Sequence, residues 1–185
     1  MTPELAKRLV AGLKDAGINF VTYLPESRLS DIIPLIRDDP DFTMVSTCHE
    51  GTAVTIACGA ALVGKRTAIY CEATGFVQSM YNLQSMAMQF GLPVLFLISY
   101  TGSPGDKANS LSFTLWGRLL EAQIRTQGLQ YRVLEDGHDL ETRVSDMAWA
   151  AQFSKMPTCL LFTGEFTDFP GMLRRDRHAN ANTNT

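Results

Sequence analysis

The stretch that decides the fold is residues 42–71, FTMVSTCHEGTAVTIACGAALVGKRTAIYC. Residues 42–46 form a short β-rich run, and residues 50–63 form an Ala-rich segment typical of a helix. After the Gly64-Lys65 turn, residues 66–71 form a second β-rich run. A strand, a helix and a further strand in this order favour parallel pairing of the two strands.

The same alternation continues outward in both directions. Upstream, the pattern predicts a helix over residues 2–17, a strand over 18–24 and a helix over 29–36. Downstream it predicts helices over 77–89, 116–126 and 140–153, strands over 93–100, 131–134 and 158–163, and a loop over 101–110. These elements predict an α/β fold with an open, mostly parallel six-stranded sheet and helices on both faces.

Composition limits the class of protein. With 185 residues, 45% hydrophobic and 19% charged, the chain suits one soluble domain over residues 1–170, followed by a polar mobile tail over 171–185. A net charge of -3 offers no basic face for nucleic acid, and no apolar stretch approaches the roughly 20 residues of a membrane helix. Four cysteines without CxxC spacing, and a charged start in place of a signal peptide, indicate reduced, buried, inert thiols in the cytoplasm.

One carboxylate, that of Glu50, lies shortly after a predicted strand. Parallel sheets bind ligands beyond the carboxyl ends of their strands, which directs attention to residues 25–27, 48–51, 72–75 and 100–105. Glu50 lies where a strand leads into a helix of small residues. The helix N-terminus favours its ionised form and burial favours its protonated form, so Glu50 is suited to proton exchange. The alternative is that Glu50 only caps the helix.

Five short segments carry a family resemblance: Gly-Ile-Asn-Phe-Val at 17–21, His-Glu-Gly-Thr-Ala-Val at 49–54, Ala-Thr-Gly-Phe at 73–76, Leu-Pro-Val-Leu at 92–95 and Ile-Ser-Tyr-Thr-Gly at 98–102, with Gly-Asp-Lys at 105–107. In these segments the chain resembles the pyrimidine-binding domain of thiamin diphosphate enzymes. The similarity is to the small-subunit type of sulfopyruvate and phosphonopyruvate decarboxylases, and it extends from about residue 5 to residue 163.

The resemblance implies a role for each matching residue. The family glutamate that matches Glu50 hydrogen-bonds N1′ of the cofactor's aminopyrimidine and so activates the cofactor to attack a 2-oxoacid. His49 either relays protons or positions its neighbour. The remaining matches imply cofactor binding by Pro25, Thr74, Gly75 and Phe76, and substrate binding by Gln78, Tyr100, Thr101 and Lys107. Thr74 and Gly75 are equally well explained as a plain strand-to-helix turn.

Several positions depart from the family pattern. Ala73 replaces an Asn, Val77 replaces a Gly, Thr101 replaces an Arg and Asp106 replaces a Glu. Because a guanidinium suits a sulfonate or phosphonate, the loss of the Arg argues against a strongly anionic substrate tail, although Lys107 remains as an anion contact. The apolar bulk at residues 113–116 fits a subunit interface or a substrate pocket.

A missing motif predicts a partner. The family holds Mg²⁺ and the diphosphate on a Gly-Asp-Gly motif, which this chain lacks, so the resemblance implies a diphosphate-binding partner subunit and an α2β2 or larger heteromer, with no metal site in this chain. Two other functions stay open. One is a subunit of an acetolactate-synthase-like carboligase, and the other is a non-catalytic α/β regulatory domain.

Overall fold

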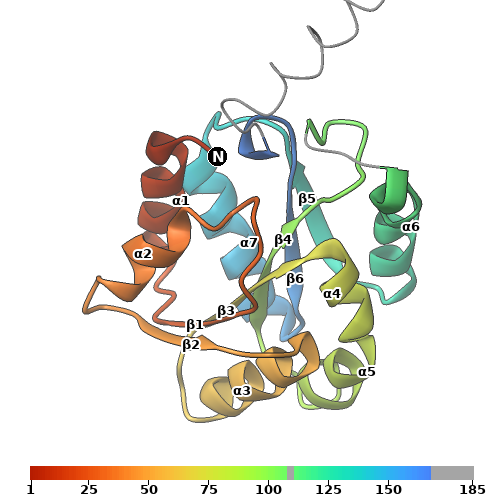
Figure 1. Cartoon of the computed structure of the whole chain (residues 1–185). Coiled ribbons are helices and arrows are strands. Elements are labelled where there is room, and N and C mark those ends of the chain that lie inside the picture. Colours follow the sequence, from red (N-terminus) through yellow and green to blue (C-terminus); the bar gives the residue numbers. More distant parts are fainter. Residues whose placement is uncertain (108–110, 168–185) are drawn as a thin grey trace, which may run out of the picture.

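The protein is built on one six-stranded sheet (Figure 1). The computed structural model describes residues 1–107 and 111–167. All five strand pairings are parallel, in the order β2-β1-β3-β4-β6-β5. The strands are β1 (Phe20–Tyr23), β2 (Thr43–Ser46), β3 (Thr67–Glu72), β4 (Val94–Ser99), β5 (Gln130–Leu134) and β6 (Thr158–Phe162). The predicted fold class is confirmed.

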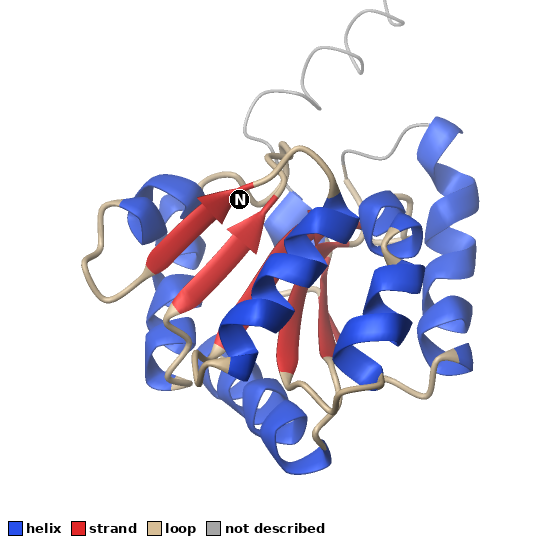
Figure 2. Cartoon of the chain, turned by 90° about the horizontal axis from the view of Figure 1, so that it is seen from below, coloured by secondary structure: helices blue, strands red, loops and turns tan. Residues whose placement is uncertain are grey.

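Helices cover both faces of the sheet (Figure 2). One face carries α1 (Pro3–Asp15), α2 (Ile32–Arg37) and α7 (Leu140–Ser154). The other carries α3 (Glu50–Leu62), α4 (Ala73–Gln78), α5 (Met80–Asn82), the π-helix η1 (Leu83–Met88) and α6 (Leu111–Thr126). A 3₁₀ turn, η2 (Gly164–Thr167), follows β6.

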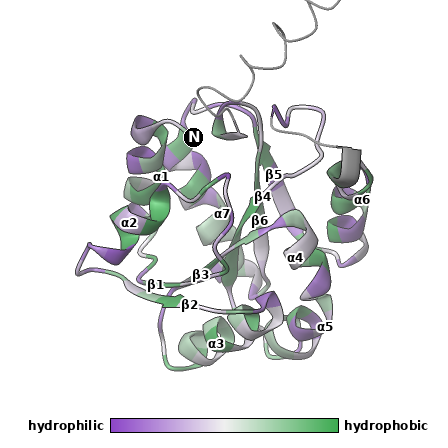
Figure 3. Ribbon diagram, in the orientation of Figure 1, coloured by the Kyte–Doolittle hydropathy of each residue, from purple (hydrophilic) through white to green (hydrophobic). Residues whose placement is uncertain are grey.

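The core lies along the central strands. Every residue of β4 and β6 is buried, and so is every residue of β3 except its last, Glu72. Strands buried on both faces are mostly apolar, and the hydropathy colouring shows this along β4 (Figure 3). The outer strands β2 and β5 are only partly buried, as expected at the two edges. Packing on both faces therefore fixes the positions of the carboxyl ends of the central strands.

The chain changes direction between β1 and β3. It runs from β1 outward to β2 and then returns, across β1, to β3 on the other side. The helices that follow the two adjacent strands pack on opposite faces, α2 on one and α4 on the other. Such a switch point opens a crevice at the carboxyl ends of the strands, where open α/β sheets bind ligands.

The predicted helix over residues 77–89 is wrong in its start and its continuity. The helix begins at Ala73, directly after β3, so that Thr74 and Gly75 lie in its first turn instead of a separate turn. It ends near Ser79, whose buried hydroxyl donates to the carbonyl of Phe76 at 2.8 Å. A hydroxyl that bonds its own backbone competes with helical hydrogen bonds, and the chain continues as α5 and η1.

Two further boundaries differ from the prediction. The helix predicted from residue 29 begins only at Ile32, because the Glu26 carboxylate accepts the N–H groups of Arg28 and Leu29 and holds them in a turn. The helix predicted from residue 116 already begins at Leu111. The predicted tail at 171–185 lies outside the described residues. Among the residues that are described, no helix is both long and apolar enough to cross a membrane.

Candidate active site

Glu50 stands at the start of α3 with its carboxylate against α4. The side chain is buried, and an added Cβ on Gly75 would overlap its carboxyl group. The close approach depends on glycine at residue 75, because any side chain there would fill the space that Glu50 occupies. Across residues 1–107 and 111–167, the Glu50 side chain makes no hydrogen bond or ion pair with another side chain or with the backbone. The carboxylate is therefore held in place by packing while its oxygens stay available.

His49 caps the helix that carries Glu50. Its Nδ1 accepts the N–H of Gly51 at 3.1 Å, which satisfies one of the open donors of the first turn of α3. Its Nε2 lies 3.2 Å from Nε2 of Gln78 on α4. The structure thus brings together His49 and Gln78, two of the predicted site residues, beside Glu50.

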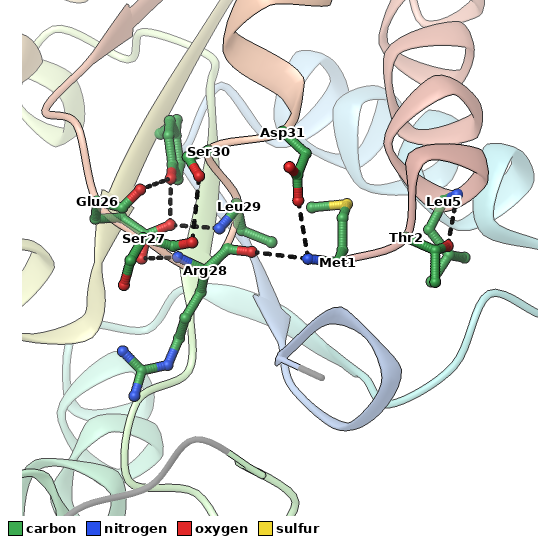
Figure 4. Close-up of polar contacts among 10 residues, drawn as sticks. Met1, Thr2, Leu5, Glu26, Ser27, Arg28, Leu29, Ser30 and Asp31 are labelled. Carbon is green, nitrogen blue, oxygen red and sulfur yellow. Dashed lines mark hydrogen bonds and ion pairs between the residues drawn. The ribbon is translucent and has the colours of Figure 1, made fainter. Parts of the chain in front are cut away.

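The loop after β1 is held by a second glutamate (Figure 4). The Glu26 carboxylate accepts the backbone N–H of Arg28 at 2.8 Å and that of Leu29 at 2.6 Å, and it accepts the hydroxyl of Tyr70. Burial, followed by the charge of Glu26, raises the pKa of Tyr70, so this hydroxyl keeps its proton as a donor. The amine of Met1 donates to the carbonyl of Arg28 at 3.4 Å. These bonds fix the backbone on one side of the crevice.

A buried ion pair joins this loop to the loop after β4. The guanidinium of Arg28, which extends away from Met1 (Figure 4), donates from Nη2 to Oδ2 of Asp106 at 3.1 Å. That oxygen also accepts the N–H of Gly102 at 2.9 Å, and Arg28 lies over the ring of Phe113. Neither Arg28 nor Asp106 was predicted to act in this way. The pair brings a guanidinium to the loop that carries Thr101, the position where the family pattern has its Arg.

A third carboxyl group, that of Glu72, lies at the end of β3. Burial raises its pKa; Thr101 and Arg28 act to lower it, and Glu26 and Glu50 act to raise it. Glu26, Glu50 and Glu72 therefore come close enough to influence one another around the β1/β3 switch point, and we call them the switch-point carboxylates. Sequence reasoning placed Glu26 and Glu72 in segments that follow strands but singled out Glu50 alone.

The comparison with protein families decides the membership of the chain. The model described as "Thiamine pyrophosphate enzyme, N-terminal TPP binding domain" matches residues 3–114, more than half of the sequence. This chain belongs to that family. Thiamine pyrophosphate is another name for thiamin diphosphate, so the resemblance seen in the sequence is confirmed.

Individual relatives agree with the family. The sulfopyruvate decarboxylase subunit alpha of Methanothermobacter thermautotrophicus is 28% identical over 73% of this chain and 76% of its own length. The phosphonopyruvate decarboxylase of Streptomyces viridochromogenes is 26% identical over 72% of this chain but only 34% of its own length. The solved benzoylformate decarboxylase of Polynucleobacter necessarius superposes with a TM-score of 0.68 at 17% identity, over 89% of this chain and 30% of that one. The chain thus spans about a third of the length of these last two decarboxylases.

The other site residues predicted from this family are not all equally available to a ligand. Pro25 is exposed after β1, and Thr74 is partly buried on α4. The ring of Phe76 is buried against Phe96, 5.1 Å between centroids, which leaves only its backbone for a cofactor. The hydroxyl of Tyr100 is already used, because it donates to the carbonyl of Gly117 and the carboxylate of Glu121.

The remaining two predicted residues lie on the loop after β4. Thr101 is fully buried, and its hydroxyl faces the carboxyl group of Glu72, whose pKa it lowers. Lys107 is exposed, and its backbone N–H donates to the hydroxyl of Thr167 at 3.2 Å. The loop is kept close to α6 by Gly102 and Gly117, whose backbones approach so closely that an added Cβ on either would overlap the other segment.

The family resemblance seen in the sequence placed the metal and the diphosphate on a partner subunit. Within residues 1–107 and 111–167, no group of three or more His, Cys, Asp or Glu residues has the geometry to hold a metal ion. Asp106 is occupied by Arg28 and Gly102. Among the described residues, the Glu50 carboxylate beside Gly75 is thus available to a ligand, and a single carboxylate suits a ring nitrogen better than a metal-bound diphosphate.

The cysteine prediction was wrong in one respect. Cys58, Cys71 and Cys159 are buried as expected, and burial raises the pKa of each thiol, to about 11 for Cys58. Cys48 is exposed, because it lies between β2 and α3 next to His49.

Proposed function

We propose that this chain is the pyrimidine-binding subunit of a two-subunit, thiamin diphosphate-dependent 2-oxoacid decarboxylase. The family membership and the similarity to a subunit named alpha of sulfopyruvate decarboxylase support the reaction and the need for a second chain. The observation that carries the role of this chain is the buried Glu50 carboxylate, held against Gly75 with no hydrogen bond to another described residue. A ring nitrogen of the cofactor is the partner that this carboxylate lacks.

In this proposal the protein controls protons and position. When bound, thiamin diphosphate supplies the carbon nucleophile and accepts the electrons that decarboxylation releases. Glu50, in the first turn of α3, would form a hydrogen bond with N1′ of the aminopyrimidine. Gly75 leaves room for that carboxylate at the start of α4. A partner subunit with a Gly-Asp-Gly motif holds Mg²⁺ and the diphosphate.

The structure changes the expectation for the substrate. The absence of Arg at position 101 suggested a substrate without a strongly anionic tail. Arg28 now brings a guanidinium to the same loop from β1, although Asp106 neutralises it. A second acidic group on the 2-oxoacid, as in sulfopyruvate, is therefore compatible with this crevice.

The decisive experiment is reconstitution. This chain is mixed with candidate subunits that carry Gly-Asp-Gly, together with thiamin diphosphate and Mg²⁺, and 2-oxoacids are screened for carbon dioxide and aldehyde. We expect release only with both chains, and a loss of at least about 100-fold for Glu50→Gln, the scale of a lost proton-transfer group. Glu135→Gln is the matched control, since Glu135 also follows a strand, β5, but is exposed at the far edge of the sheet.

Two results would contradict the proposal. One is carbon dioxide release by this chain alone, and the other is full activity of the Glu50→Gln complex. Analysis of the products with and without an acceptor aldehyde separates a decarboxylase from a carboligase.

A further inference from the structure

Glu72 carries a carboxyl group that the fold does not use. It occupies the N-cap position of α4, where an acidic side chain commonly accepts a backbone N–H, yet its side chain makes no capping hydrogen bond. Its Oε1 is buried and has no hydrogen-bond partner among the residues that the structure describes. A buried, unsatisfied acceptor costs about 1–3 kcal/mol, and functional sites are where such groups persist.

Two buried hydroxyl groups lie close to this carboxyl group. Ser99 is paired with Glu72 across β3 and β4, and Thr101 follows two residues later. Both side chains are completely buried. Within residues 1–107 and 111–167 the Ser99 hydroxyl has no hydrogen-bond partner, and the Thr101 hydroxyl faces the Glu72 carboxyl group, whose pKa it lowers. Thus a carboxyl group and two hydroxyl groups gather on two adjacent strand ends, at the edge of the sheet where the proposed cofactor glutamate lies.

The surroundings of Glu72 favour its protonated form more than the surroundings of an exposed glutamate do. Burial raises its pKa, and the carboxylates of Glu26 and Glu50 raise it further, while the Thr101 hydroxyl and the Arg28 guanidinium act in the opposite direction. The net direction is upward. Burial in a complete enzyme, beneath a partner subunit, would add to this effect.

We propose that Glu72 is a catalytic acid of the reaction, and that Ser99 and Thr101 bind the same 2-oxoacid. The inference rests on the proposed function. Decarboxylation to an aldehyde consumes one proton for each carbon dioxide released. The O–H bond of Glu72 breaks, a C–H bond forms on the carbon that lost its carboxylate, and the Glu72 carboxylate regains a proton from water. Glu72 is the last residue of β3 and lies three residues before Gly75, against which the Glu50 carboxylate packs.

The test uses the reconstituted two-chain complex with ferricyanide as an alternative acceptor. In Glu72→Gln we expect aldehyde formation to fall about 100-fold, a typical contribution of general acid catalysis. Ferricyanide should restore carbon dioxide release, because two ferricyanide ions each accept one electron of the pair that would otherwise form the C–H bond. The product is then the carboxylic acid, with its added oxygen from water.

Two further measurements separate catalysis from structure. Affinity for thiamin diphosphate, measured by calorimetric titration, should be unchanged in Glu72→Gln. The urea midpoint of the free subunit should be equal or higher, because the substitution removes a desolvated carboxyl group whose raised pKa costs stability at neutral pH. The control Glu135→Gln should match the wild type in every assay.

The proposal is overturned if Glu72→Gln makes aldehyde at the wild-type rate, if ferricyanide fails to restore carbon dioxide release, or if the free subunit is destabilised. Glu50→Gln distinguishes this failure from failure of the proposed function. It should be inactive with and without ferricyanide, and an active Glu50→Gln complex would overturn the role of the cofactor glutamate itself.

Discussion

The carboxylate of Glu50 lies over the α-carbon of Gly75, so that a methyl group on residue 75 would occupy the same space. The two residues come from different helices, α3 and α4, which begin at the same edge of the sheet. Glycine at 75 is therefore required by the placement of a carboxylate, and not by backbone conformation, because Gly75 is helical and has no positive φ.

Gly75→Ala should displace the Glu50 carboxylate without unfolding the subunit, because the group that must move is the end of a side chain. A displacement of about 1 Å at a reacting group can cost about 100-fold in rate, and we expect a loss of that order in the reconstituted complex. Gly59→Ala is the matched control. Gly59 is also helical, but its added Cβ would meet nothing within 4 Å, and the substitution should stabilise the subunit by about 0.5–1 kcal/mol. Equal activity losses in both variants would contradict the prediction.

His49 can be tested as a cap and as a proton relay with two substitutions. His49→Ala removes the acceptor of the Gly51 N–H and should lower the free energy of unfolding by about 1 kcal/mol in urea titrations. His49→Asn keeps an acceptor at the cap and should retain most of that stability. If His49 only positions Glu50, the Asn variant also keeps its activity; a relay would be lost in both variants.

Much of the fold could be predicted from the sequence because its elements are marked by local signals. Central strands such as β4 are continuous apolar runs bounded by Gly and Pro, and α3 is rich in Ala. The break after α4 was missed because it depends on the Ser79 hydroxyl bonding its own backbone, which leaves no periodic signal.

The site was predictable only in part, for a similar reason. Glu50 and His49 were found because they belong to one contiguous motif at a strand end. The pair of Arg28 and Asp106 joins two loops far apart in the chain, so neither residue alone indicates it. The use of Tyr100 by α6 is likewise a tertiary contact without a local pattern.

Substituting one partner of the buried pair of Arg28 and Asp106 should strongly lower the free energy of unfolding. Asp106→Asn keeps an acceptor for Gly102 but leaves the Arg28 charge buried without its countercharge, and should cost about 3–5 kcal/mol of unfolding free energy. The double variant Arg28→Met/Asp106→Asn should be more stable than Asp106→Asn alone, since neither charge of the pair remains. Urea unfolding of the four subunits of this cycle measures the coupling. Simple addition of the two single effects would show that the pair does not act as a unit.

The ion pair between Arg8 on α1 and Glu141 on α7 should make stability depend on pH. Its two hydrogen bonds, each 2.6 Å, lower the pKa of Glu141 below its usual value near 4.5. A lowered carboxyl pKa gives stability that is present above the unfolded pKa and is lost as the pH falls through the folded one. Glu141→Gln should therefore lower the urea midpoint at pH 7, and the difference from wild type should shrink once the pH falls below about 4. A difference that stays constant over this range would exclude the ion pair as its cause.

Cys48 offers a direct chemical test of the site, because it is exposed beside His49 whereas the other three thiols are buried. Only thiolates attack disulfide reagents, and burial raises the pKa of Cys58, Cys71 and Cys159, so the free subunit should react rapidly at a single thiol with dithiobisnitrobenzoate. The bulky adduct would lie two residues from Glu50, just before the start of α3. Labelled wild-type subunit should then fail to support decarboxylation on reconstitution, whereas Cys48→Ser treated in the same way should remain active. Rapid labelling of Cys48→Ser would show that a second thiol is accessible and would remove this explanation for any loss of activity.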